Sequence, residues 1–221
     1  MPSKAYLAFA ENAKDIERLL ELHKDKGGLE RGRRFGLEVL NKSAIVLLTS
    51  FWEAYCEDIA AEALEHLVVH APSSDKLPLE LRKIVAKELK AENHDLAIWK
   101  LSDDGWRAVL KSRLAAMQTE RNRRLNTPKS DQIDTLFLSA LGMPKTSDRW
   151  RWKGTTADRS RKKLDKYVEL RGAIAHRGAA ASSVKKAQVE DYFGHISRLV
   201  SRTGGAVYSQ VRSVTPVRLW A

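Results

Sequence analysis

The residues from Phe35 to Val69 read FGLEVLNKSAIVLLTSFWEAYCEDIAAEALEHLVV, and the pattern of this stretch decides the fold. Its apolar side chains recur at spacings of three and four, the period of an amphipathic helix. They are Leu37, Leu40, Ala44, Leu47, Phe51, Tyr55, Ile59 and Ala63. An earlier helix is expected from about Ala5 to His23, with Gly27-Gly28 as its stop, so the two stretches predict a helical hairpin.

The rest of the chain continues the helical period. Further helices or helix-like segments are expected at Pro78–Leu89, Leu96–Met117, Asp131–Leu141, Lys162–Ala175 and Val184–Val200. The last two predict a second helical hairpin. The sequence contains no phosphate-binding loop, no GxGxxG and no His-Glu-x-x-His, which excludes the usual signatures of nucleotide-binding sheets and zinc hydrolases. We therefore predict an all-α bundle built on antiparallel helix pairs, with one domain over residues 1–203. After Gly204-Gly205 we expect an extended or disordered tail over 204–221.

The composition favours a polyanionic partner. The chain has 221 residues, with 39 Lys and Arg against 28 Asp and Glu, for a net charge of +11. For a small domain nucleic acid is the commoner polyanion, although charge alone does not distinguish it from general surface solvation. The single cysteine, Cys56, cannot form an internal disulfide, which favours a reducing, cytoplasmic setting. Ala44–Leu48 is the longest uninterrupted apolar run, so no membrane association is expected.

The most informative short segment is Glu169–Gly178, ELRGAIAHRG, in which Arg171 and His176 stand five positions apart. A guanidinium suits phosphate oxygens, and imidazole exchanges a proton near neutral pH. At about 100° per residue, five positions separate the two side chains by roughly 140° on a regular helix. Either the helix distorts near Gly172 or Gly178, or two chains face each other so that Arg171 of one and His176 of the other line one groove.

This segment resembles the R-x4-6-H signature of the HEPN superfamily. Further stretches follow the order seen in its RiboL-PSP-HEPN subfamily: they are Ser50–Tyr55, Leu125–Pro128, Ile133–Phe137, Leu141-Gly142, Val168–Arg171 and Ile174–His176. The resemblance covers roughly Leu37 to Leu199. It implies an all-helical, frequently dimeric protein that cleaves RNA without a metal or another cofactor, in a prokaryotic defence or toxin–antitoxin setting with an antitoxin or regulatory partner.

The resemblance also implies roles for individual residues. Arg171 and His176 match the catalytic pair, and Glu53 matches an acidic residue near the motif in many members. The 2′-hydroxyl of RNA would attack the adjacent phosphate, with His176 as general base or acid and Arg171 stabilising the phosphorane. Gly172 departs from the polar residue often found after the arginine, so a catalytically inactive module that binds RNA or a protein remains the alternative.

A basic, tryptophan-containing stretch precedes the motif, and its cations could neutralise phosphates while its indoles stack on unpaired bases of single-stranded RNA or tRNA. The predicted RNA-binding residues are Arg149, Trp150, Arg151, Trp152, Lys153, Arg159, Arg161, Lys162, Lys163 and Arg177. The competing interpretation is a solvated helix face whose tryptophans pack inward. A helical DNA-binding protein is a third possibility, but the sequence shows no short turn joining two helices in the required arrangement.

Overall fold

The computed structural model describes residues 2–27, 37–119, 127–177 and 183–220, and the side chains of residues 26, 27, 176 and 177 are not part of that description. The α-helices are α1 (Lys4–Gly27), α2 (Glu38–His70), α3 (Leu79–Ala91), α4 (Gly105–Thr119), α6 (Ser130–Leu141), α7 (Ala157–Arg177) and α8 (Lys186–Val214). Short 3-10 turns are η1 (Ser74–Lys76), η2 (Ala97–Leu101) and η3 (Thr146–Arg149). Within these ranges there is no β-strand, which confirms the predicted all-α class.

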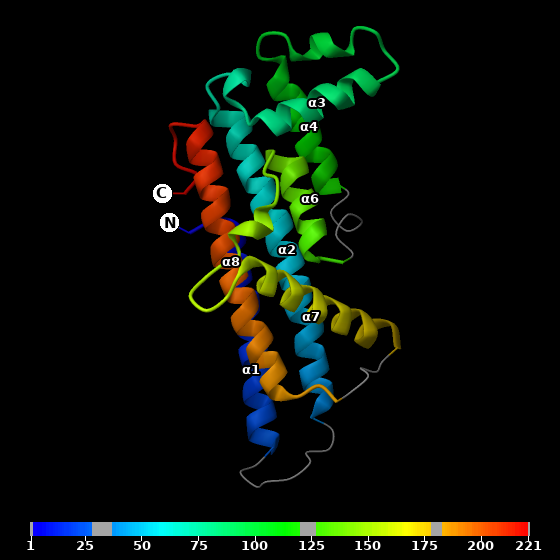
Figure 1. Cartoon of the computed structure of the whole chain (residues 1–221), viewed down its shortest axis with the longest axis vertical. Helices are drawn as coiled ribbons and strands as arrows, with labels where there is room; N and C mark the ends of the chain where they lie inside the picture. The colour runs from blue at the N-terminus through cyan, green and yellow to red at the C-terminus, as the bar shows by residue number, and fades with distance from the viewer. Residues whose placement is uncertain (1, 28–36, 120–126, 178–182, 221) are drawn as a thin grey trace.

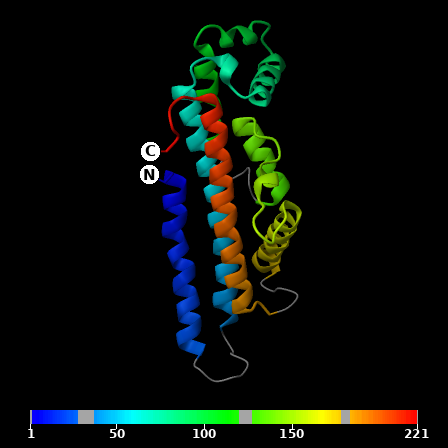
Figure 2. The same ribbon diagram turned by 60° about the vertical axis from the view of Figure 1, so that its left-hand side comes forward.

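The long helix α2 forms the centre of the molecule. α1, α8 and α2 run side by side along the longest axis, with α1 antiparallel to α2 (Figure 1, Figure 2). α4, α6 and α7 also pack on α2, so it is apolar on several faces rather than on one stripe. Leu48, Trp52 and Ile59 are completely buried, and burying each such side chain contributes roughly 1.5–3 kcal/mol.

The C-terminal part of the chain differs from the prediction. α8 continues without interruption through Gly204-Gly205 to Val214, so the expected tail over 204–221 is wrong up to that residue. Val207 and Val211 are fully buried on the same face as the earlier apolar residues of the helix. The irregular segment begins only at Thr215.

The short C-terminal segment is docked rather than free. Trp220 stacks on Tyr208 with ring centroids 5.7 Å apart, and its Nε1 donates to Glu62 Oε1 at 2.9 Å. The same carboxylate accepts from the backbone N–H groups of Lys4 and Ala5 at the start of α1, at 3.3 and 3.2 Å. Glu62 of α2 therefore holds both ends of the described chain, which lie close together in Figures 1 and 2.

The middle of the chain was predicted less well. The single apolar-patterned segment expected over Leu96–Met117 is divided into η2 and α4, because the chain turns at Ser102–Asp104. Asp103 adopts a positive φ of 49° in this turn. α3, η2 and α4 cover one end of the long helices (Figure 1). No helix in the described ranges is long and apolar enough to cross a bilayer.

Candidate active site

The helix that carries the Arg171–His176 pair is regular. α7 extends from Ala157 to Arg177 and passes through Gly172 without a break. The backbone therefore places positions 171 and 176 roughly 140° apart around one helix axis. Distortion at Gly172 is excluded as a way of bringing the two side chains of one chain together. Gly178 and the side chains of His176 and Arg177 lie outside the described residues.

Arg171 is a half-buried cation that has no bonded carboxylate among the residues that the structure describes. Its Nε is buried and has no hydrogen-bond partner among the described residues. The two acidic residues nearest in sequence are engaged elsewhere. Glu169 pairs with Lys129 at 2.7 Å, and Asp165 accepts from the backbone N–H and hydroxyl of Ser130 at 2.8 and 2.9 Å. A partly desolvated guanidinium with unused donors is suited to binding an external anion.

Glu53 faces this cation from α2. Partial burial, together with the neighbouring carboxylate of Glu57, raises the pKa of Glu53 to about 7, against the opposing effect of the Arg171 charge. The structure thus brings together two of the three residues expected to form the site, from helices more than a hundred positions apart in sequence. A carboxyl group with such a pKa exchanges its proton near neutral pH.

A stacked tyrosine pair includes Tyr192, which lies within the electrostatic influence of Arg171, and neither tyrosine was predicted as a site residue. The Tyr192 and Tyr167 rings stack with centroids 4.2 Å apart. The buried Tyr192 hydroxyl is 3.0 Å from Thr49 Oγ1, and the Tyr167 hydroxyl donates to Asp191 Oδ2 at 2.9 Å. Burial raises the pKa of Tyr192, and the charge of Arg171 acts in the opposite direction. Both tyrosines lie on apolar helix faces, so the sequence pattern identifies them only as core positions. The one available signal is that a buried phenol hydroxyl needs a polar partner.

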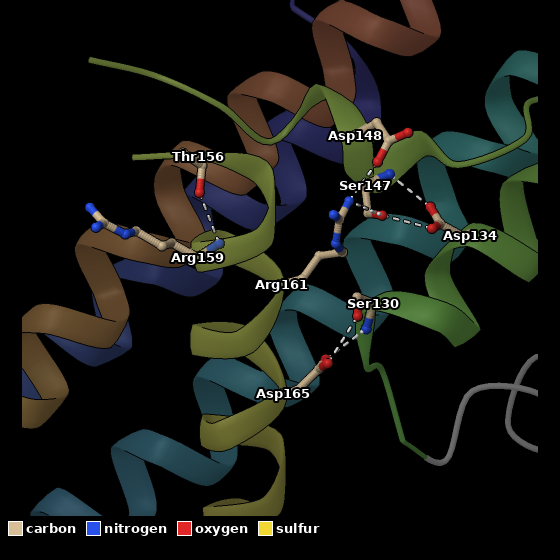
Figure 3. Close-up of polar contacts among 8 residues, drawn as sticks. All are labelled: Ser130, Asp134, Ser147, Asp148, Thr156, Arg159, Arg161 and Asp165. Carbon is tan, nitrogen blue, oxygen red and sulfur yellow. Dashed lines mark hydrogen bonds and ion pairs between the residues drawn. The ribbon is translucent and has the colours of Figure 1, made fainter. Parts of the chain in front are cut away.

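The first half of α7 is anchored to α6 and to the turn η3 (Figure 3). Asp165 caps the start of α6 as described above. On the other side, Asp134 of α6 accepts from the backbone N–H and hydroxyl of Ser147, both at 2.7 Å, and Arg161 pairs with Asp148 at 2.6 Å. Asp165 and Arg161 thus attach α7 at two points through charge-assisted bonds, and Asp134 joins η3 to α6.

One of three comparisons with known proteins gives a match. The family model of RiboL-PSP-HEPN matches residues 10–208, which is most of the chain and includes Glu53, Arg171 and His176. The chain belongs to the RiboL-PSP-HEPN family. No curated protein and no solved structure matches it. HEPN domains are generally related to ribonucleases.

In this RiboL-PSP-HEPN chain, the two tryptophans that were predicted to stack on RNA bases are not exposed enough to do so. Trp150 is completely buried, packs edge-on against Trp52 and donates from Nε1 to Thr203 Oγ1 at 2.9 Å. It is a core residue, so the prediction that it stacks on bases is wrong. Trp152 is half-buried against His195, with ring centroids 5.6 Å apart, which leaves it little surface for stacking.

Of the eight basic residues predicted to bind RNA, the side chain of Arg177 lies outside the described residues, and the other seven fall into two groups. Three are held by carboxylates: Arg161 by Asp148, Lys162 by Asp158 at 3.0 Å and Lys163 by Asp191 at 2.6 Å. The other four are exposed and make no ion pair within the described ranges: they are Arg149, Arg151, Lys153 and Arg159. Figure 3 shows the side chain of Arg159 pointing away from the bonded cluster. The second group keeps its charge available to phosphates.

Two other titratable side chains, His195 and Cys56, are buried in the core. His195 is buried, its Nε2 lies 3.1 Å from the backbone oxygen of Ser160, and burial lowers its pKa to about 4. Cys56 is fully buried, and burial raises the pKa of its thiol, as suits an inert core residue. Among the described residues, no group of His, Cys, Asp and Glu side chains could hold a metal ion.

Proposed function

We propose that this protein is a metal-independent endoribonuclease in which Arg171 and His176 act on one phosphodiester. The observation that carries the proposal is the half-buried guanidinium of Arg171, which faces Glu53 and has no bonded carboxylate among the described residues. In an ordinary structural role this cation would pair with Glu169 or Asp165, but those side chains bind Lys129 and Ser130. Its unused donors are suited to a phosphate group.

The chemistry needs only groups that the chain supplies. The 2′-hydroxyl loses its proton to a general base as its oxygen attacks the adjacent phosphorus, and the leaving 5′-oxygen receives a proton. His176 acts as general base or acid, and Arg171 stabilises the negative charge on the phosphorane. The products are a 2′,3′-cyclic phosphate and a 5′-hydroxyl. Glu53, which titrates near neutral pH, orients Arg171 or His176. DNA lacks the 2′-hydroxyl and is therefore not cut.

The regular path of α7 supports a dimer. Because the helix is unbroken, positions 171 and 176 of one chain lie about 140° apart around its axis, which disfavours their acting on one linkage from the same chain. Two copies related by a two-fold axis place Arg171 of one protomer beside His176 of its partner, and the symmetry creates the site twice. We place this dimer in the cytoplasm of a prokaryote, in a defence or toxin–antitoxin role, restrained by an antitoxin or another regulatory partner. Its substrate is single-stranded RNA or tRNA.

The catalytically inactive module remains a second candidate because of Gly172, which follows the motif arginine. A Cβ built at Gly172 meets nothing within 4 Å, so packing does not require glycine there. In this alternative the protein binds RNA or a protein without cutting it. The cleavage assay below separates the two functions.

The test is cleavage of labelled single-stranded RNA in excess EDTA by wild-type protein and by the variants Arg171→Ala and His176→Ala. We expect wild-type cleavage with cyclic-phosphate ends, and a loss of roughly 10²–10⁴-fold in each variant, the range for removing one group that acts on the transition state. Arg82→Ala and His94→Ala serve as matched controls, since both side chains are exposed and lie outside the site. Absence of cleavage by wild-type protein would overturn the proposal and leave the binding module.

A further inference from the structure

A second basic site lies well away from the Arg171 region. A groove of about 690 Å³ runs between the loop after α6 and the C-terminal half of α8. Its loop wall carries Lys145, Arg149 and Arg151, and its helix wall carries Arg202. Ser201, Ser209, Gln210 and Ser213 of α8 add polar groups along the same wall. The groove thus combines four cations with hydrogen-bonding side chains.

The charge of this groove is not compensated. No aspartate or glutamate lines it. Lys145, Arg149, Arg151 and Arg202 are exposed, and none makes an ion pair with any residue that the structure describes. The nearby Arg161 is bonded to Asp148, so uncompensated charge is not a general property of this region. Four like charges facing one concave surface repel each other and attract an anion.

A buried hydroxyl on the groove wall also lacks a partner. Thr146 is 2% exposed, lines the groove, and its Oγ1 has no hydrogen-bond partner within the described ranges. Leaving a buried hydroxyl unsatisfied costs about 1–3 kcal/mol. The preceding residue, Lys145, has a positive φ of 51°, a conformation that is unfavourable for a side chain other than glycine, asparagine or aspartate. Both features indicate a segment arranged for a ligand rather than for stability alone.

The shape of the groove selects among phosphate ligands. On the α8 side it is bordered by small residues, and a Cβ built at Gly205 meets nothing within 4 Å, so a ligand can come close to this helix. No aromatic side chain lines it, so bases have no stacking surface there. Such a groove favours the repeated phosphates of a nucleic-acid backbone over a single nucleotide held by its base.

We propose that this groove binds backbone phosphates of the RNA strand at a distance from the cleaved linkage. Tyr192, next to Arg171, and Ser209 of the groove are 17 positions apart on α8, or about 25 Å along the helix. A strand stacked at roughly 3.4 Å per nucleotide covers that distance in about seven nucleotides. The identity of the ligand as RNA rests on the proposed function. The presence of a phosphate site rests on the groove itself.

The experiment measures binding separately from cleavage. A labelled 20-nucleotide single-stranded RNA is titrated by fluorescence anisotropy against protein carrying His176→Ala, in EDTA, over a range of salt. The test variant adds Lys145→Gln and Arg202→Gln, one cation from each wall. The control adds Arg82→Gln and Lys87→Gln, an exposed arginine and an exposed lysine of α3, so that both proteins lose the same charge.

We expect the test variant to raise the Kd at least tenfold and the control to change it less than twofold. Loss of two phosphate contacts lowers the slope of log K against log salt by about 1.4 for a single strand. Thr146→Val should weaken binding a few-fold without lowering the Tm, because it removes a hydroxyl that has no partner. Unchanged melting curves confirm that the exposed substitutions leave the fold intact.

Equal affinities of the test and control variants would overturn the inference. So would tight binding of inorganic tripolyphosphate that leaves RNA binding unaffected, because the groove would then serve a free polyphosphate. Failure of the nuclease proposal would give a different experimental result from failure of the groove proposal. Wild-type protein would leave RNA uncut while the test variant still bound it more weakly, and the phosphate groove would stand.

Discussion

The electrostatic interaction between Glu53 and Arg171 is the central feature of the proposed site. Sequence placed Glu53 on the long second helix and Arg171 near the end of another, and family resemblance linked them. The structure adds that Arg171 retains unused donors because Lys129 and Ser130 occupy its acidic neighbours. The unused donors of Arg171 could not be predicted from the sequence, because they depend on how α6 packs against α7 and not on any spacing within α7.

Glu53 provides a pH-dependent prediction. Its pKa rises from 4.5 in the unfolded chain to about 7 in the folded protein, so folding takes up a proton between these values. Below pH 4.5 the carboxyl is neutral in both states and has no effect. As pH rises from 4.5 to 7, the unfolded chain loses this proton while the folded protein keeps it, so stability falls by roughly 2 kcal/mol and levels off above pH 7.

Glu53→Gln removes this dependence. The free energies of unfolding of wild type and variant, measured by urea denaturation, should diverge between pH 5 and pH 8, with the variant gaining relative stability at the higher pH. Other titrating groups are common to both proteins and cancel in the difference. A difference that is constant across this range would show that Glu53 does not titrate there.

The stretch Arg149–Trp152 shows why part of the predicted RNA-binding surface was wrong. Basic and aromatic residues alternate in it, which resembles a surface that neutralises phosphates and stacks bases. Alternating residues of an irregular or extended segment point to opposite sides. Trp150 therefore enters the core while Arg149 and Arg151 face solvent and line the groove. The sequence pattern shows that the side chains alternate, but it does not show which side faces the protein interior.

At the scale of the elements, periodicity predicted most helices, and glycine was the main source of error. Gly142 ends α6 as expected, with a positive φ of 65°. Gly204-Gly205, taken as the same kind of signal, lies inside α8. The reason is a tertiary contact. A Cβ at Gly204 would come within 2.9 Å of the Tyr55 hydroxyl, which donates to the backbone oxygen of Val200 at 2.9 Å. Gly204 provides room for a tyrosine on another helix.

Gly204 and Gly205 of α8 therefore predict opposite effects of the same substitution. Gly205→Ala meets nothing within 4 Å and should stabilise the helix by about 1 kcal/mol, raising the Tm by roughly 2–4 °C. Gly204→Ala collides with the buried, hydrogen-bonded Tyr55 and should destabilise the protein by about 1–3 kcal/mol. Thermal melts of the two variants provide the comparison, and equal effects would contradict the packing described here.

At the scale of the whole molecule, the two regions proposed to bind phosphate lie at different places along the long bundle. The Arg171 region lies where α7 meets α2 and the first half of α8, whereas the basic groove lies along the second half of α8. Sequence predicted the fold class and the motif helix. It did not predict the groove, because Lys145 and Arg202 are 57 positions apart and only the packing of η3 on α8 brings their segments together. The regular course of α7 through Gly172 favours the proposed site shared between two chains.

The most direct test of a site shared between two chains is complementation. Arg171→Ala and His176→Ala chains with different affinity tags are co-expressed, and the mixed dimer is purified through both tags. One of its two sites then contains an intact Arg171 and an intact His176, and the other contains neither. We predict RNA cleavage at about half the wild-type rate from the mixed dimer, while each parent variant alone is inactive. A mixed dimer no more active than its parents, beside an active wild-type protein, would contradict the shared site.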